Sequence, residues 1–98
     1  MNTRNKIYVV EDIAITRLMI INTLEKNGYE IVGESNSAEK AWKEISKLSP
    51  NLVLLDINLY GEKDGLWLGK QIDQYLKIPF IYITAYQDQH TTNEILET

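Results

Sequence analysis

The stretch "NLVLLDINLYGEKDG", residues 51–65, decides the fold of this chain. Its four consecutive apolar residues, Leu52 to Leu55, predict a short strand that is buried on both faces. The strand ends on a carboxylate, Asp56, and a loop rich in Asp, Glu, Asn and Gly follows. An acid at this place is often only a helix cap or a turn former, so the rest of the chain must show whether Asp56 has a function.

Strand and helix patterns alternate along the chain. Further strands are expected at residues 6–11, 29–34 and 79–84, beside the one at 51–56. Helices are expected at residues 14–27, 37–48, 65–76 and 87–97. This order predicts an α/β fold, with a parallel sheet covered by helices on both faces and joined by right-handed crossovers. Residues 1–98 show no internal repeat and no linker, so one domain is expected.

The helix patterns also predict caps and inward-facing stripes. Ser37 is the expected N-cap of the second helix, and Gly28 is the expected C-cap glycine of the first. The stripe of the second helix comprises Ala38, Ala41, Trp42, Ile45 and Leu48. The stripe of the third comprises Leu66, Gly69, Ile72 and Leu76. A glycine on such a stripe lets the helix lie close to the sheet.

Composition narrows the class of protein. The chain has 98 residues, of which 44% are hydrophobic and 24% charged, as in an ordinary globular domain. Its net charge of -4 argues against direct binding to nucleic acid or to an anionic membrane. There is no cysteine, which excludes disulfides and thiolate sites. The N-terminus has no apolar run long enough for a signal peptide or a membrane span, so the cytoplasm is the expected location.

Acidic side chains follow two strands that are expected to be neighbours. Glu11 and Asp12 end the first strand, and Asp56 ends the third. Because the carboxyl ends of parallel strands lie along one edge of the sheet, these three carboxylates are expected to converge there. Two like charges repel by about 4 kcal/mol at roughly 4 Å and an effective dielectric of about 20. Raised pKa values, a basic partner or a bound cation must offset that repulsion.

Among cations, Mg²⁺ suits such a site, since it takes one or two carboxylates and retains several waters. Thr84, at the end of the fourth strand, adds a hydroxyl donor suited to a phosphoryl oxygen. The residues therefore predict a Mg²⁺ site beside a carboxylate that is able to act as a nucleophile.

Four motifs carry a resemblance to a known family. They are "YVVED" (8–12), "NGYEIVGE" (27–34), "PNLVLLDINLYGEKDG" (50–65) and "IPFIYITAY" (78–86). Together they resemble the receiver (phospho-acceptor) domain of two-component response regulators, over essentially all 98 residues. The resemblance implies a flavodoxin-like doubly wound sheet with strand order 2-1-3-4.

The resemblance also implies roles for the acidic residues. Asp56 takes the position of the aspartate that accepts a phosphoryl group from a phosphohistidine on a histidine kinase or phosphotransfer protein. Asp12 is the implied direct Mg²⁺ ligand, and Glu11 acts mainly through water. Asp56 itself and the backbone carbonyl of Asn58 complete the coordination by the protein.

Four residues that follow or end the third and fourth strands have implied roles in switching. Thr84 corresponds to the residue that bonds the phosphoryl oxygen and senses the modified state. Ala85 fits the need for a small residue beside the phosphoryl group. Asn58 and Tyr86 hold the variable positions that tune the lifetime of the phosphate. The domain would thereby control an output module, DNA-binding or other, and would not be an enzyme in the ordinary sense.

One part of the family pattern does not occur in this sequence. The family has a fifth strand that ends in Lys-Pro and a fifth helix, and the sequence stops at Thr98 before either. We therefore expect a C-terminally incomplete receiver, with its fourth strand left as a sheet edge. A dimer through that edge or through the fourth helix is a hypothesis.

Two other interpretations remain open from the sequence. A phosphatase of the haloacid dehalogenase type also uses an aspartate after an apolar strand, but it places a second aspartate where this chain has Asn58. An EF-hand Ca²⁺ loop matches "DINLYGEKDGLW" (56–67) in part, but it requires other residues than Tyr60 and Trp67.

Overall fold

The computed structural model describes residues 5–59 and 61–83. Its strands are β1 (Lys6–Val10), β2 (Glu30–Ser35), β3 (Leu52–Asp56) and β4 (Phe80–Ile83). Its helices are α1 (Ala14–Lys26), α2 (Ala38–Leu48) and α3 (Gly65–Gln71), the last continued by the π-helical turn η1 (Ile72–Leu76). Each strand and helix expected in this part of the chain is present.

The four strands form one parallel sheet in the order β2-β1-β3-β4, as the resemblance implies. Strand β1 lies between β2 and β3, with Val10 opposite both Ser35 and Leu55. The last described pair of β3 and β4 is Asp56 with Ile83. The carboxyl ends of β1 and β3 are therefore neighbours, which is the condition for their acids to meet.

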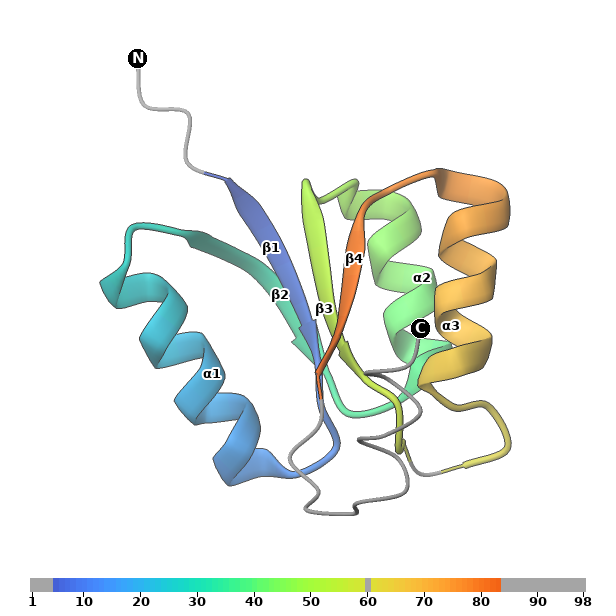
Figure 1. Ribbon diagram of the computed structural model, residues 1–98, viewed down its shortest axis with the longest axis horizontal. Helices are drawn as coiled ribbons and strands as arrows, with labels where there is room; N and C mark the ends of the chain where they lie inside the picture. Colours follow the sequence, from blue (N-terminus) through green and yellow to red (C-terminus); the bar gives the residue numbers. More distant parts are fainter. Residues whose placement is uncertain (1–4, 60, 84–98) are drawn as a thin grey trace, which may run out of the picture.

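Helices cover both faces of the sheet (Figure 1). On one face α2 and α3 pack over a core that includes Tyr8, Ile45, Val53, Leu55 and Leu68. On the other face α1 packs over a smaller cluster of Ile7, Val9 and Ile21. Within the described ranges, no helix is long and apolar enough to cross a membrane.

The local signals act as expected at three positions. The hydroxyl of Ser37 caps α2 by accepting a hydrogen bond from the backbone N–H of Lys40 at 3.3 Å. Gly28 follows α1 with φ at +89°, a conformation that favours glycine. Gly69 lies against β4, and a Cβ there would come within 3.0 Å of Cε2 of Phe80. The missing side chain thus allows the close approach of α3 to the sheet.

The predicted stripes were wrong at two leucines. Leu66 is 44% exposed, and Leu68 is the buried leucine of α3, because the helix begins with Gly65 pressed against the backbone of Asp56 and Ile57. Leu48 is 43% exposed because it ends α2 beside the outer strand β2, where solvent reaches it.

The third helix also differs in its last turn. The N–H of Lys77 bonds to the carbonyl of Ile72 at 2.8 Å, five residues back, so Ile72–Leu76 is a π-helical turn. Other boundaries differ from the predicted ones by about one residue. The predicted helix at 87–97 and the predicted strand end at Thr84 lie outside the described residues.

Candidate functional site

Three carboxylates meet at the carboxyl edge of the sheet. Glu11 and Asp12 follow β1, and Asp56 ends the neighbouring strand β3. One oxygen atom of each lies within 4.8 Å of one oxygen of each of the others. The structure therefore brings together the three acids that the sequence singled out.

This cluster is buried and has free acceptor atoms. Glu11 and Asp56 are fully buried, and Asp12 is half-buried. Three buried oxygens have no hydrogen-bond partner among the described residues: Oε1 of Glu11, Oδ1 of Asp12 and Oδ2 of Asp56. Because a buried polar atom without a partner is costly, these oxygens favour a ligand that binds oxygen.

Backbone N–H groups hold the other oxygens of the two buried acids. The N–H of Ile13 donates to Oε2 of Glu11 at 3.1 Å. The N–H of Asn58 donates to Oδ1 of Asp56 at 3.0 Å. Each buried carboxylate is thus fixed through one oxygen and left free at the other.

The electrostatics favour a cation at the cluster. Burial raises the pKa of Glu11 to about 8, and its interactions with Asp12 and Asp56 act in the same direction. Burial also raises the pKa of Asp56, and the charge of Asp12 adds to the effect. A divalent cation with a preference for oxygen would offset this penalty, and the donor set fits Mg²⁺.

An open cavity of about 320 Å³ lies beside the cluster. Its lining residues are Asp12, Ile57, Asn58, Leu59, Gly61, Glu62 and Asp64. Room for a ligand therefore exists on the loop side of Asp12, next to the residues that follow Asp56.

The start of α3 fixes the far side of this cavity. Oδ1 of Asp64 caps the helix by accepting a hydrogen bond from the N–H of Trp67 at 2.9 Å. Gly65 then packs on the backbone of Asp56, and a Cβ there would lie 2.7 Å from Cα of Ile57. A backbone contact of this kind cannot yield easily, so the glycine is required for the chain to pass this close to Asp56.

The other predicted residues fall into two groups. Asn58 lies in the described part of the chain. Its backbone N–H donates to Oδ1 of Asp56, and Asn58 also lines the cavity. Thr84, Ala85 and Tyr86 lie outside the described residues.

Two residues near the cluster were missed from the sequence. Arg17 of α1 donates to the backbone carbonyl of Glu11, and it pairs with Glu34 of β2. The sequence offered only a weak signal, an arginine five residues after Asp12 and an acid near the end of the second strand.

The structure does not favour the two other interpretations. The strand β3 precedes Asp56, where an EF-hand has a helix, and Trp67 lies within α3. The residue two places after Asp56 is Asn58, where a dehalogenase-type phosphatase has its second aspartate.

Known proteins with similar sequences show to which family the chain belongs. The profile of the response regulator receiver domain matches residues 7–98. The chain is 39% identical over 70 residues to the chemotaxis protein CheY of Bacillus subtilis, covering 71% of this chain and 58% of CheY. It is 31% identical over 94 residues to the transcriptional regulatory protein YdfI of the same organism, covering 95% and 44%. The chain thus spans about half the length of these curated relatives.

A solved structure shares the fold. The signal receiver domain of a modulated diguanylate cyclase from Desulfovibrio desulfuricans G20 superposes with a TM-score of 0.83 at 27% identity, covering 97% of this chain and 75% of that one. The profile match extends over nearly the whole sequence, and the acidic edge and strand order agree with it. The chain therefore belongs to the receiver domain family of two-component response regulators, and the part that this domain plays in them is signalling.

Proposed function

We propose that Asp56 accepts a phosphoryl group from the phosphohistidine of a histidine kinase or phosphotransfer protein, in a reaction that depends on Mg²⁺. The observation that carries the proposal is the buried cluster, in which Glu11, Asp12 and Asp56 each keep one oxygen without a partner. Membership of the receiver family supports the same reaction.

In this proposal four groups hold the cation. They are the carboxylates of Asp12 and Asp56, the carboxylate of Glu11 through water, and the backbone carbonyl of Asn58. When bound, Mg²⁺ neutralises charge on these carboxylates and on the phosphoryl oxygens. The raised pKa values of Glu11 and Asp56 are the reason that such neutralisation is needed.

Asp56 acts as the nucleophile through one of its two carboxylate oxygens, and the other oxygen remains for the cation. The N–H of Asn58 donates to Oδ1 and so fixes the orientation of the carboxylate in which Oδ2 has no partner. As the O–P bond forms, the N–P bond of the phosphohistidine breaks, and its electron pair stays on the imidazole. The product is an aspartyl phosphate on β3.

Four residues complete the proposed switch. Thr84 bonds a phosphoryl oxygen and so signals the modified state, and Ala85 leaves room for the phosphoryl group. Asn58 and Tyr86 tune how long the phosphate survives. The change in charge at Asp56 then shifts the domain between two states that an output module or partner reads.

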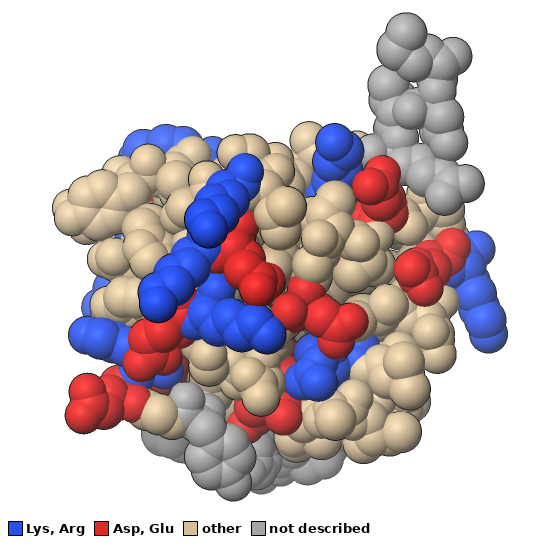
Figure 2. Space-filling view, turned by 180° about the vertical axis from the view of Figure 1, so that it is seen from behind, with Lys and Arg blue, Asp and Glu red and all other residues tan. Residues whose placement is uncertain are grey.

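The proposal places this activity in the cytoplasm, without direct binding of nucleic acid or membrane by the domain. On the face that Figure 2 shows, Asp and Glu side chains lie among and beside the Lys and Arg side chains, which acts against binding of a polyanion there. The net charge of -4 also disfavours binding of nucleic acid or of an anionic membrane.

The test is to incubate the chain with acetyl phosphate and Mg²⁺ and to measure its intact mass. We expect one added phosphoryl group on the unchanged protein and none on Asp56→Asn. Asp73→Asn, which changes an exposed aspartate of η1, is the matched control and should still be modified. Labelling of Asp56→Asn to the same extent would refute the proposal.

A further inference from the structure

Arg17 of α1 joins three elements at the acidic edge. Its Nη1 donates to the backbone carbonyl of Glu11 at 2.6 Å. Its Nε donates to Oε1 of Glu34, near the end of β2, at 2.8 Å. The pair with Glu34 is the one salt bridge within residues 5–59 and 61–83. The side chains of Arg17 and Glu34 are 19% and 51% exposed, so solvent reaches the ion pair from the side of Glu34, while the bond from Arg17 to the carbonyl of Glu11 is partly buried.

These bonds fix the backbone that carries two of the three acids. The N–H of Glu11 donates to the carbonyl of Ser35 at 3.1 Å, and Arg17 binds the carbonyl of the same residue. Both backbone polar groups of Glu11 are therefore occupied. Asp12 follows directly, so the direction of its side chain depends on the same peptide.

The start of α1 has no side-chain cap to hold it in place. Ile13 occupies the N-cap position, and no side chain there accepts a hydrogen bond from the first turn. The link from Arg17 to Glu11 therefore ties the first turn of α1 to the end of β1, where a cap would otherwise act. A lysine could not reproduce this link, because it lacks the two divergent N–H groups of the guanidinium.

Glu34 explains why the positive charge of Arg17 does not pair with the acidic cluster. The guanidinium contacts Glu34 and a neutral carbonyl, while one oxygen each of Glu11, Asp12 and Asp56 stays without a partner. Arg17 therefore supports the backbone of Glu11 without neutralising the three carboxylates, whose negative charge remains available to a cation.

We propose that Arg17, oriented by Glu34, is a positioning residue that sets Glu11 and Asp12 for metal binding. The inference rests on the proposed function, because the metal is the one required for phosphorylation of Asp56. It makes a prediction that charge alone does not make. Removing a positive charge near three carboxylates should strengthen the binding of a cation by Coulomb's law, whereas the loss of positioning should weaken it.

The test compares the Mg²⁺ dissociation constants of the chain and its variants by isothermal titration calorimetry. Arg17→Met should weaken binding by about tenfold, the scale of other supporting contacts at metal sites. Lys26→Met removes a positive charge from the exposed last turn of the same helix and is the matched control. It should leave the constant unchanged or slightly lower it.

Glu34→Gln is the second variant. Because the Glu34 side chain is 51% exposed, the variant should keep its fold, which circular dichroism checks. It should weaken Mg²⁺ binding in the unchanged chain but add little in the Arg17→Met background, since Glu34 acts through Arg17. Equal effects of Glu34→Gln in both backgrounds would overturn the inference.

The two proposals can fail separately. If the unchanged chain binds Mg²⁺ and is phosphorylated, but Arg17→Met matches Lys26→Met, the positioning role is refuted and the proposed function stands. If the unchanged chain neither binds Mg²⁺ nor gains a phosphoryl group, the proposed function fails and the inference falls with it.

Discussion

At the scale of single residues, Glu11 shows how the fold creates a demand for a cation. Its carboxylate is fully buried beside two others, and burial raises its pKa to about 8. The folded chain therefore keeps a proton on Glu11 at pH values where the unfolded chain has released it. A group that holds a proton more tightly when folded stabilises the fold below its ordinary pKa and loses that contribution as the pH rises.

We expect the free energy of unfolding, without Mg²⁺, to fall as the pH rises from about 4.5 to about 8, the two pKa values of Glu11. Under the proposed function Mg²⁺ takes the place of this proton, so the stabilisation that Mg²⁺ gives should grow over the same pH range. Urea unfolding followed by circular dichroism, with and without Mg²⁺, measures both.

Glu11→Gln supplies the control for this prediction. The amide cannot titrate, so the variant should show a flatter pH dependence, with the raised pKa of Asp56 accounting for what remains. An identical slope in both proteins would show that Glu11 does not contribute.

The sequence predicted the acidic cluster because strand ends are a property of local pattern. Glu11, Asp12 and Asp56 each follow an apolar run, and parallel strands place such residues on one edge. The role of Arg17 was not predictable in this way. Its bond to a backbone carbonyl depends on the angle at which α1 leaves β1, which no local pattern encodes.

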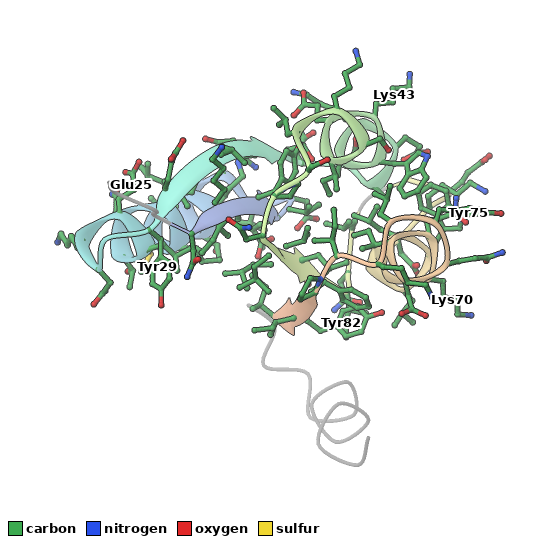
Figure 3. The ribbon with its side chains drawn as sticks, turned by 90° about the horizontal axis from the view of Figure 1, so that it is seen from above. Glu25, Tyr29, Lys43, Lys70, Tyr75 and Tyr82 are labelled. Atoms are coloured by element: carbon green, nitrogen blue, oxygen red, sulfur yellow. The ribbon has the colours of Figure 1, made fainter. Side chains whose placement is uncertain are left out.

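At the scale of elements, the contact of α3 with β4 is set by one glycine. Tyr82 projects from β4 toward α3, as Figure 3 shows, and a Cβ on Gly69 would meet its ring, with Cζ at 3.1 Å. Phe80 packs edge-on against Tyr82, with ring centroids 5.4 Å apart, so the ring has little freedom to move away. The position therefore has a steric need for glycine despite the cost of glycine within a helix.

Gly69→Ala should lower the free energy of unfolding by about 1–2 kcal/mol, because overpacking outweighs the gain in helix propensity. The loss should be smaller in a Tyr82→Phe background, where the hydroxyl nearest to the new methyl is absent. Urea unfolding of the four proteins of this double-mutant cycle measures the coupling. Equal losses in both backgrounds would contradict the steric account.

The helices and strands were predicted to within about one residue, whereas the buried side of each helix was predicted less accurately. Ser37 and Gly28 gave the ends of helices because caps act within one turn. The stripe of α3 was misassigned at Leu66 because the rotation of the helix is set by the contact of Gly65 with β3. That contact is tertiary and leaves no periodic signal.

At the scale of the whole molecule, the two faces of the sheet are covered unequally. Two helices pack over one face, while α1 on the other lies nearest to β1 and β2. Ile81 of β4 pairs with Leu54 on this second face and is 52% exposed, with no described element over it. Strand β4 is also an edge of the sheet in the described part of the chain.

We expect this edge to support self-association, as the sequence suggested. Ile81→Lys places a charge on the edge strand, which disfavours pairing between chains. Sedimentation over a range of concentrations should show less dimer for Ile81→Lys than for the unchanged chain. Tyr75→Lys, which changes an exposed aromatic residue on η1, is the matched control and should not alter the equilibrium. A monomer at all concentrations would contradict the expectation.

The strand order was predicted through the family resemblance rather than through pattern alone. Alternating strands and helices specify a parallel sheet, but they do not say on which side of β1 each new strand is added. The motifs "YVVED" and "PNLVLLDINLYGEKDG" supplied that information.

The pairing of β1 with β3 determines when, during folding, the acidic cluster is assembled. Lys6 and Asn51, which bond at the start of this pair, are 45 residues apart, and a helix–strand–helix unit forms between them. Contacts of such sequence separation slow folding, because the entropy of closing the intervening loop is lost before the contact is gained. A nascent or partly unfolded chain therefore has Asp56 without Glu11 and Asp12 beside it, and under the proposed function a kinase would phosphorylate only molecules that have completed this pairing.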